Sequence, residues 1–419
     1  MIKPRWKSSV KQSRKPGNTS SLQHRRTVFD GWRSISISLY MTLVGYAVLV
    51  GVPVISTAWV ELLGFTEEQV GRVAGADLGG LSLGAVIASL LVSRMNRRIL
   101  VLIGVAIVIL SNGLCVVFLD YETVLWLRVG AGIGSGIYTA VAVATLGGSS
   151  RPAFAFNLML FAFAFSQALE MQVLPMLSMN GIYLTFIGCY LFGLAFLHWL
   201  PARPLDKSLE VELEVEEEGG GQHVEPRAVP SYIPWLCLAA IVLTYVNIGA
   251  YWTYIELASL DAGIDDHYVG RLLVWTSFFS LVGCGVATII SNRFGLARPL
   301  LIALFAMATI VGMLAFGIND INILISMFSF NLLWIFVDVY QMSTVANVDH
   351  SGSFASLMPG AQGLGQIVGP NIAASMLGAG LGYGSVFIMC ACAAMLGLMV
   401  YGGMYLWLRK TIPALAEAS

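Results

Sequence analysis

Apolar runs of about 20 residues recur along most of this 419-residue chain, and a helix of that length spans the hydrocarbon core of a bilayer. Only 11% of the residues are charged and 57% are hydrophobic, whereas a soluble domain carries about 25% charged residues. We therefore predict an all-α integral membrane protein with twelve transmembrane helices. These are expected near 34–58, 69–92, 99–118, 123–147, 153–176, 180–200, 232–258, 267–290, 297–317, 321–346, 354–377 and 383–408.

A stretch that leads into the second expected helix occurs twice in the sequence. Residues 64–72 read GFTEEQVGR and residues 263–271 read GIDDHYVGR, so the two copies are offset by 199 positions. The apolar run after each copy ends in a basic turn, SRMNRR in the first and SNRFGLAR in the second. Such a long repeat is typical of a transporter built from two pseudo-symmetric six-helix halves. The expected segments are a disordered basic tail (1–33), two halves (34–200 and 232–410), an acidic linker (201–231) and a second tail (411–419).

The distribution of charge predicts the orientation of the chain in the membrane. Of the 23 Lys and Arg residues, all but Arg72, Arg128 and Arg271 fall in segments that lie on the side of the N-terminus. The loops expected on the opposite side carry acidic residues and neither Lys nor Arg. Because cytoplasmic segments are enriched in Lys and Arg, both termini are expected in the cytoplasm, with the protein multi-pass in the cell (inner) membrane.

The twelve-helix pattern, the central linker and the basic turns resemble the major facilitator superfamily (MFS). Its turn between helices 2 and 3 reads G-x-x-x-D-R-x-G-R-R, and residues 89–98 here read SLLVSRMNRR, with Ser93 at the acidic position. The second copy has Asn292 at that position. The resemblance implies a latch that stabilises the outward-open state. Because the acid is missing from both copies, the latch is expected to be weaker here or to use another partner. The candidate latch residues are Arg94, Arg97, Arg98, Arg293 and Arg298.

Further motifs refine the resemblance without naming a cargo. The stretch RVGAGIGSG, which begins at Arg128, is similar to helix 4 of the family, and its spaced glycines allow a neighbouring helix to approach closely. The stretches YWTYIE, DVYQM and DHSGSFASLMPGAQGLGQ look similar to bacterial members without an assigned substrate. The G-P-x-x-G-G pattern of the antiporter subset is missing from the fifth helix, which disfavours drug–proton antiport.

Ionisable side chains within membrane helices are costly and so indicate function. The candidate proton-coupling residues are Glu170, Asp338, Asp77 and Glu256. Depth arguments place Arg128 at a level similar to Glu170, with Asp77 somewhat deeper, which predicts a buried cluster of the three. One Arg against two acids leaves one carboxyl group uncompensated and able to carry a proton. The alternative is a structural ion pair that fixes helix packing.

Polar and aromatic side chains near mid-depth are expected to line a substrate cavity between the halves. The candidates are Arg128, Tyr46, Tyr245, Asn247, Tyr251, Asn331, Trp334, Gln341, Gln362 and Gln366. Interhelical hydrogen bonding is the alternative role for the stripe that contains Asn331, Trp334 and Asp338. For Trp252, Tyr254 and Glu256, near the outer boundary, the alternative is a belt at the membrane interface.

No catalytic or nucleotide-binding motif is visible: the chain has neither a GxxxxGKS loop nor an HExxH helix. We expect no enzyme activity, no cofactor, no metal and no nucleic-acid partner. The predicted function is secondary transport of a small organic solute by alternating access, coupled to protons, with symport preferred and a monomer as the working unit. The alternatives are efflux of a drug or metabolite by proton antiport, and a non-transporting membrane sensor or scaffold.

Overall fold

A computed structural model describes residues 28–92, 94–149, 152–202, 230, 232–290, 295–348 and 353–411. These residues form helices and no strand. The first half contains η1 (Val28–Asp30), α1 (Trp32–Gly45), α2 (Ala47–Leu63), α3 (Glu67–Leu91), α4 (Arg97–Val117), α5 (Tyr121–Gly147), α6 (Pro152–Val173), η2 (Leu174–Met176), α7 (Met179–Ala195) and η3 (Leu197–Trp199). The second half contains α9 (Tyr232–Asp261), α10 (Asp266–Thr276), α11 (Phe279–Ile290), α12 (Ala297–Met313), η4 (Leu314–Phe316), α13 (Asp320–Val348), α14 (Ser353–Gly378) and α15 (Tyr383–Thr411).

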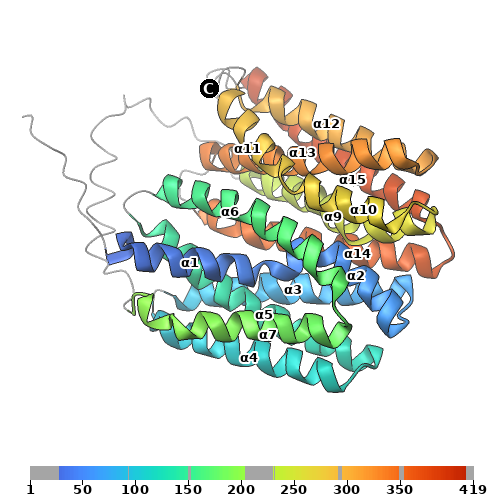
Figure 1. Cartoon of the computed structure of the whole chain (residues 1–419). Coiled ribbons are helices and arrows are strands. Elements are labelled where there is room, and N and C mark those ends of the chain that lie inside the picture. Colours follow the sequence, from blue (N-terminus) through green and yellow to red (C-terminus); the bar gives the residue numbers. More distant parts are fainter. Residues whose placement is uncertain are drawn as a thin grey trace, which may run out of the picture.

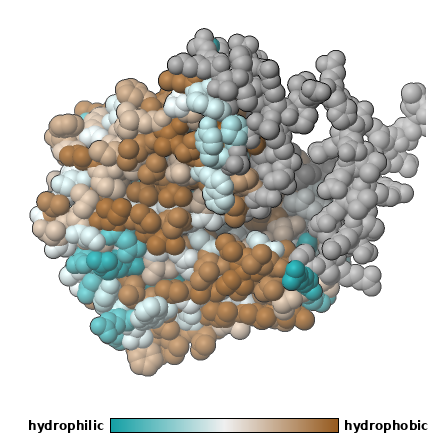
Figure 2. Space-filling model, turned by 180° about the vertical axis from the view of Figure 1, so that it is seen from behind, coloured by the Kyte–Doolittle hydropathy of each residue, from teal (hydrophilic) through white to brown (hydrophobic). Residues whose placement is uncertain are grey.

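The prediction of a twelve-helix membrane protein is confirmed. Ten stretches of the described residues are long and apolar enough to cross a membrane, and α7 and α14 complete the twelve. Two of the spans are interrupted, since α1 and α2 form one span, as do α10 and α11. Large apolar side chains are exposed on the surface, as lipid contact requires, and Figure 2 shows them covering much of one face. Most of the predicted linker, 203–229, and the segments 1–27 and 412–419 lie outside the described residues.

The two halves repeat one packing scheme. In the first half α5 packs against α1, α3 and α4, and α4 packs against α7. In the second half α13 packs against α9, α11 and α12, and α12 packs against α15, which are the equivalent pairs. Figure 1 shows α1–α7 in the lower part and α9–α15 in the upper part. The arrangement is consistent with two pseudo-symmetric halves.

The repeated stretches form the same structure in both halves. Gly64 and Gly263 have positive φ angles of 71° and 80°, a conformation that glycine adopts without a steric penalty, and each ends a helix. Two residues later, Thr66 and Asp265 accept hydrogen bonds from the backbone N–H groups that begin α3 and α10. The offset of 199 is therefore an offset between equivalent helix starts.

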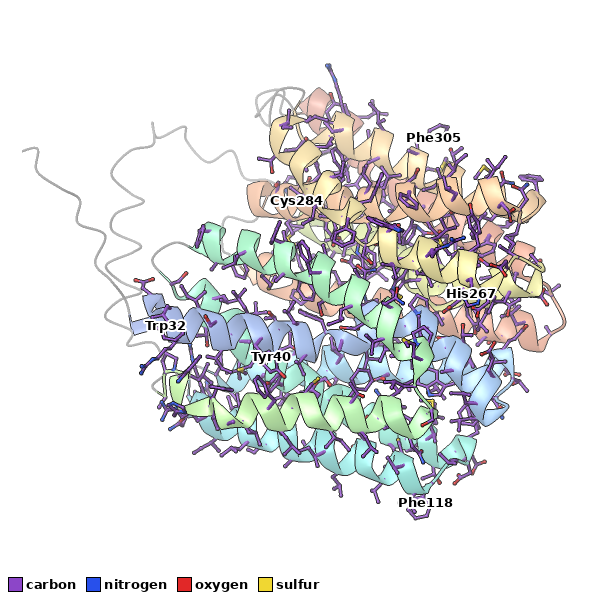
Figure 3. All side chains as sticks on the ribbon, viewed as in Figure 1. Trp32, Tyr40, Phe118, His267, Cys284 and Phe305 are labelled. Carbon is purple, nitrogen blue, oxygen red and sulfur yellow. The ribbon has the colours of Figure 1, made fainter. Side chains whose placement is uncertain are left out.

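These starts lie at one end of the molecule, which we call the acidic end, and Trp32 lies at the other, the basic end. Figure 3 shows His267 and Phe118 at the acidic end and Trp32 opposite them. Asp120, beside Phe118, accepts a hydrogen bond of 3.0 Å from the Thr123 N–H at the start of α5. A hydrogen bond from the Thr123 side chain, together with this one from its N–H, holds the pKa of the exposed Asp120 carboxyl below its usual range.

The halves meet along α3 and α14, α2 and α9, and α6 and α10. Three of the hydrogen bonds that join them run from Trp252 to the Val50 carbonyl, from Tyr254 to the Glu67 carbonyl, and from Arg72 to Ser375. All three lie in the part of the molecule nearer the acidic end. In this conformation the halves are thus closed together at the acidic end.

Candidate functional site

A carboxylate and a phenol meet within the second half, facing the first. The Tyr245 hydroxyl on α9 donates to both oxygens of Asp338 on α13, at 2.8 Å each. Trp334, one turn earlier on α13, lies close enough to interact with both groups. Asp338 is half-buried, and no Lys or Arg of the described residues forms an ion pair with it. An uncompensated carboxyl group therefore lies within the membrane-spanning stretch Asp320–Val345.

The first half contributes Tyr46 to the same region. Tyr46 separates α1 from α2 with φ −92° and ψ 2°, which is not a helical conformation. Its hydroxyl lies within electrostatic range of Tyr245, and its ring packs on Phe163 of α6 with centroids 5.5 Å apart. Interrupted helices near the midplane are where transporters of this type place their binding sites. Tyr46, Tyr245, Trp334 and Asp338 are thus brought together from both halves, and we call them the midplane site.

A second polar cluster lies buried within the first half. Arg128 on α5 donates from Nε to Asp77 on α3 at 2.8 Å and forms an ion pair with it. It also donates from Nη1 to the Asn112 amide oxygen on α4 at 2.7 Å. All three side chains are at most 2% exposed. The cluster ties together three helices of one half, which is the structural ion pair considered as the alternative.

The predicted cluster of Arg128 with Glu170 is wrong in its pairing. Asp77, not Glu170, compensates Arg128. Glu170 on α6 accepts a hydrogen bond from Ser166 at 3.1 Å, and its other oxygen has no partner among the described residues. That oxygen faces Gly51 of α2. The prediction used depth along the helix alone, whereas the side of α6 on which Glu170 lies is set by packing.

Asn112 was not among the predicted residues. A signal for it exists, because it is an amide in the middle of the otherwise apolar run 99–118. A neutral amide was not counted among the ionisable groups, although an amide oxygen is a good acceptor for a buried guanidinium.

Several predicted cavity residues are instead buried in interhelical contacts of the second half. Asn331 donates to Thr276 of α10 at 3.2 Å, and Gln341 donates to Thr244 of α9 at 2.8 Å. Tyr251 hydrogen-bonds with Ser326 at 2.9 Å and stacks on the ring of Phe330. In this conformation these residues hold α9, α10 and α13 together.

The predicted amides differ in their surroundings. Asn247 on α9 is fully buried, and neither amide atom has a hydrogen-bond partner among the described residues. Gln366 on α14 is 5% exposed and packs against Gly249 of α9, whereas Gln362 is half-buried. These amides therefore do not share one exposed surface.

The interpretation of Trp252, Tyr254 and Glu256 as an interfacial belt is wrong. Each is at most 4% exposed. Trp252 and Tyr254 form the hydrogen bonds to the first half described above, and Glu256 interacts with Thr57 of α2. The three residues face the other half rather than lipid headgroups. A belt at the membrane interface requires exposure to lipid, which these side chains lack.

The candidate latch residues of the first half bind within that half. Arg97 is 1% exposed, donates to the Thr145 hydroxyl at 3.0 Å and lies over the Phe29 ring at 4.6 Å. Arg98 donates to the backbone carbonyls of Leu200 and His198 at 2.8 and 2.7 Å. These contacts replace the missing acid. Arg94 and Arg298 are exposed, and Arg293 lies outside the described residues.

No metal-binding group is found in the described part of the chain, which holds no set of three or more His, Cys, Asp or Glu placed to share an ion. The midplane site and the Asp77–Arg128 cluster are instead hydrogen-bonded groups among the membrane-spanning helices.

Comparison with known proteins identifies the family. The family model of the Major Facilitator Superfamily matches residues 34–370. No curated protein sequence gives a significant match. The twelve helices and the family match define a multi-pass membrane transporter rather than an enzyme. The chain belongs to the major facilitator superfamily, and its substrate is a small molecule.

Solved structures share the fold at low sequence identity. A D-xylose–proton symporter matches with a TM-score of 0.68 and 14% identity, covering 88% of this chain and 96% of that chain. The nucleoside transporter NupG matches with a TM-score of 0.66 and 11% identity, covering 88% of this chain and 99% of that chain. A structure of a proton-dependent oligopeptide transporter matches with a TM-score of 0.69 and 14% identity, covering 90% of this chain and 99% of that chain. At these identities the comparison establishes the fold alone.

Proposed function

We propose that this protein is a proton-coupled symporter that takes up a small organic solute by alternating access of its two halves. The observation that carries the proposal is the half-buried Asp338 carboxylate, held by Tyr245 and without a cationic partner among the described residues. Such a group lowers the electrostatic cost of its burial by binding a proton. Its hydrogen-bond donor Tyr245 lies within electrostatic range of Tyr46 of the other half, so the surroundings of the carboxylate change when the halves move.

Glu170 is the second proposed proton site. It too lacks a cationic partner among the described residues, and its unpartnered oxygen faces α2. Asp77 is less suited to the role, because Arg128 compensates its charge. The basic end is proposed to be cytoplasmic, since it carries the Arg-rich turns, and the acidic end faces outward.

The proposed solute is amphiphilic or contains a ring, because aromatic faces and hydrogen-bonding groups occur together at the midplane site. Phe330, Trp334 and Trp252 pack around one another next to it, with ring centroids 6.0–6.4 Å apart. Two neighbours in fold are named as a D-xylose–proton symporter and proton-dependent oligopeptide transporters, which is compatible with this mode of coupling. We propose that a monomer is sufficient, since each six-helix half packs fully within one chain.

The direction in which protons move distinguishes symport from antiport. The purified protein is reconstituted into vesicles that contain a pH-sensitive dye, and pools of metabolites and drugs are added outside. Symport predicts that an effective pool acidifies the interior, because the proton enters with the solute. Antiport, the second candidate, predicts that the interior becomes alkaline. Solute uptake without a change of pH would contradict proton coupling, and no uptake with any pool would favour a sensor or scaffold.

A further inference from the structure

Glu256 is a carboxyl group buried in the seam between the two halves at the acidic end. It lies five residues before the end of α9, it is 4% exposed, and its Oε2 has no hydrogen-bond partner among the described residues. The group that interacts with it across the seam is Thr57 of α2, whose hydroxyl itself donates to the Pro53 carbonyl at 3.3 Å. The seam at this point therefore contains a carboxyl group that packing alone does not explain.

The charges that act on Glu256 are acidic. Asp266 on α10 and Glu61 on α2 both act on it electrostatically, and both are exposed at the acidic end. No Lys or Arg of the described residues forms an ion pair with it or acts on its charge. A buried carboxylate without a counter-ion, repelled by two others, is costly, whereas a protonated carboxyl group carries no charge to bury.

The seam that surrounds Glu256 is the contact that closes the acidic end. Trp252, one turn earlier on α9, donates to the Val50 carbonyl at 3.3 Å, and Tyr254 donates to the Glu67 carbonyl at 2.8 Å. If α2 and α9 separate, Glu256 meets water and its charged form is no longer penalised. Closure and protonation of this one group are thus linked, since each favours the other.

We propose that Glu256 is a proton-operated lock on the acidic end: protonation holds the halves closed there, and ionisation releases them. The direction of the pH effect follows from the linkage between closure and protonation of Glu256. A lower pH on the acidic side favours closure, and a higher pH favours opening. The inference rests on the proposed function only for its use in transport, where a proton taken from outside would close the outer side before the inner side opens.

The lock can be tested without solute or proton gradient. Spin labels are attached at Phe118→Cys and Phe316→Cys in a variant whose native cysteines are replaced, because both positions are exposed at the acidic end and belong to different halves. Distances between the labels are then measured in lipid nanodiscs from acidic to alkaline pH. The parent is expected to show a growing population of longer distances as the pH rises.

Three variants make the result specific. Glu256→Gln, a permanent mimic of the protonated form, is expected to keep the short distance at every pH. Glu256→Asp retains a carboxyl group and is expected to retain the response. Glu122→Gln is the matched control and is expected to respond as the parent does, since Glu122 is an exposed acid at the start of α5 and is not among the groups that act on the charge of Glu256. A parent without pH response, or a Glu256→Gln variant that responds as the parent does, would overturn the lock. Neither result depends on symport, so the two proposals fail separately.

Discussion

The Tyr245 hydroxyl on α9 is shared between the two carboxylate oxygens of Asp338 on α13, at 2.8 Å each. This hydroxyl holds both oxygens of a carboxyl group with which Trp334 also interacts. The two residues lie 93 positions apart, on helices that pack against each other in the second half. A change at either residue should therefore alter how Asp338 holds a proton or a solute.

Removal of the Tyr245 hydroxyl is expected to impair transport without unfolding the protein. Hydrogen bonds to charged groups contribute about 1.5–3 kcal/mol, and about 1.4 kcal/mol is a factor of ten. Tyr245→Phe should thus reduce solute-driven proton flux by about tenfold or more. Tyr251→Phe is the matched control, because that hydroxyl bonds to Ser326 away from the midplane site. Equal losses in both variants would argue against a special role for Tyr245.

The Asp77–Arg128 ion pair is expected to stabilise the first half. Breaking a buried pair by removing one partner costs about 3–5 kcal/mol, because a charge is left uncompensated. Asp77→Ala should lower the free energy of unfolding in detergent by about that amount. The double variant Asp77→Ala with Arg128→Leu should lose less, since no charge then remains buried. A single variant as stable as the parent would contradict this role.

Glycines on α3 and α5, at the surface where the two helices pack together, are expected to tolerate no side chain. A Cβ atom at Gly84 would lie 2.1 Å from the Ile133 carbonyl oxygen, and one at Gly136 would lie 2.0 Å from that of Leu81. Gly84→Ala and Gly136→Ala should each cost about 1–3 kcal/mol of unfolding free energy. Gly113→Ala is the control, because no heavy atom lies within 4 Å of its Cβ position. If Gly113→Ala lowered the free energy of unfolding by as much as the other two substitutions, overpacking would not be the cause of their instability.

The Phe29 ring is expected to hold the basic end of the first half together. It covers the buried Arg97 guanidinium and packs against Gly148 at the end of α5. A desolvated cation–π contact contributes about 2 kcal/mol. Phe29→Leu should lower the thermal unfolding temperature, whereas Phe29→Tyr, which keeps the ring, should not. Equal unfolding temperatures for the two variants would exclude the cation–π contact as the source of stability.

The sequence predicts much of the fold because the relevant signals are local. The length of each apolar run determines a span, and the offset of 199 between Thr66 and Asp265 identifies equivalent helix starts. The basic turns and the glycine spacing on α5 indicate the family in the same way. None of these inferences requires knowledge of how one helix is rotated against another.

The candidate site is less predictable because it depends on that rotation. Depth along a helix placed Arg128 and Glu170 at similar heights, yet Asp77 is the partner of Arg128. Close packing of Gly80 and Gly132 brings α3 onto α5 and directs Asp77 toward Arg128, while Glu170 faces α2. The same limit explains the error for Trp252 and Tyr254: the belt was inferred from their predicted depth, but their side chains point toward the other half.

The central claim, proton coupling through Asp338, is tested most directly by proton flux in the Asp338→Asn variant. Vesicles with an internal pH-sensitive dye are given a solute pool that acidifies parent vesicles, and Glu122→Gln, an exposed acid at the start of α5, serves as the control. The account predicts that the pH change disappears in Asp338→Asn and persists in Glu122→Gln. Acidification by Asp338→Asn at the rate of the parent would contradict it.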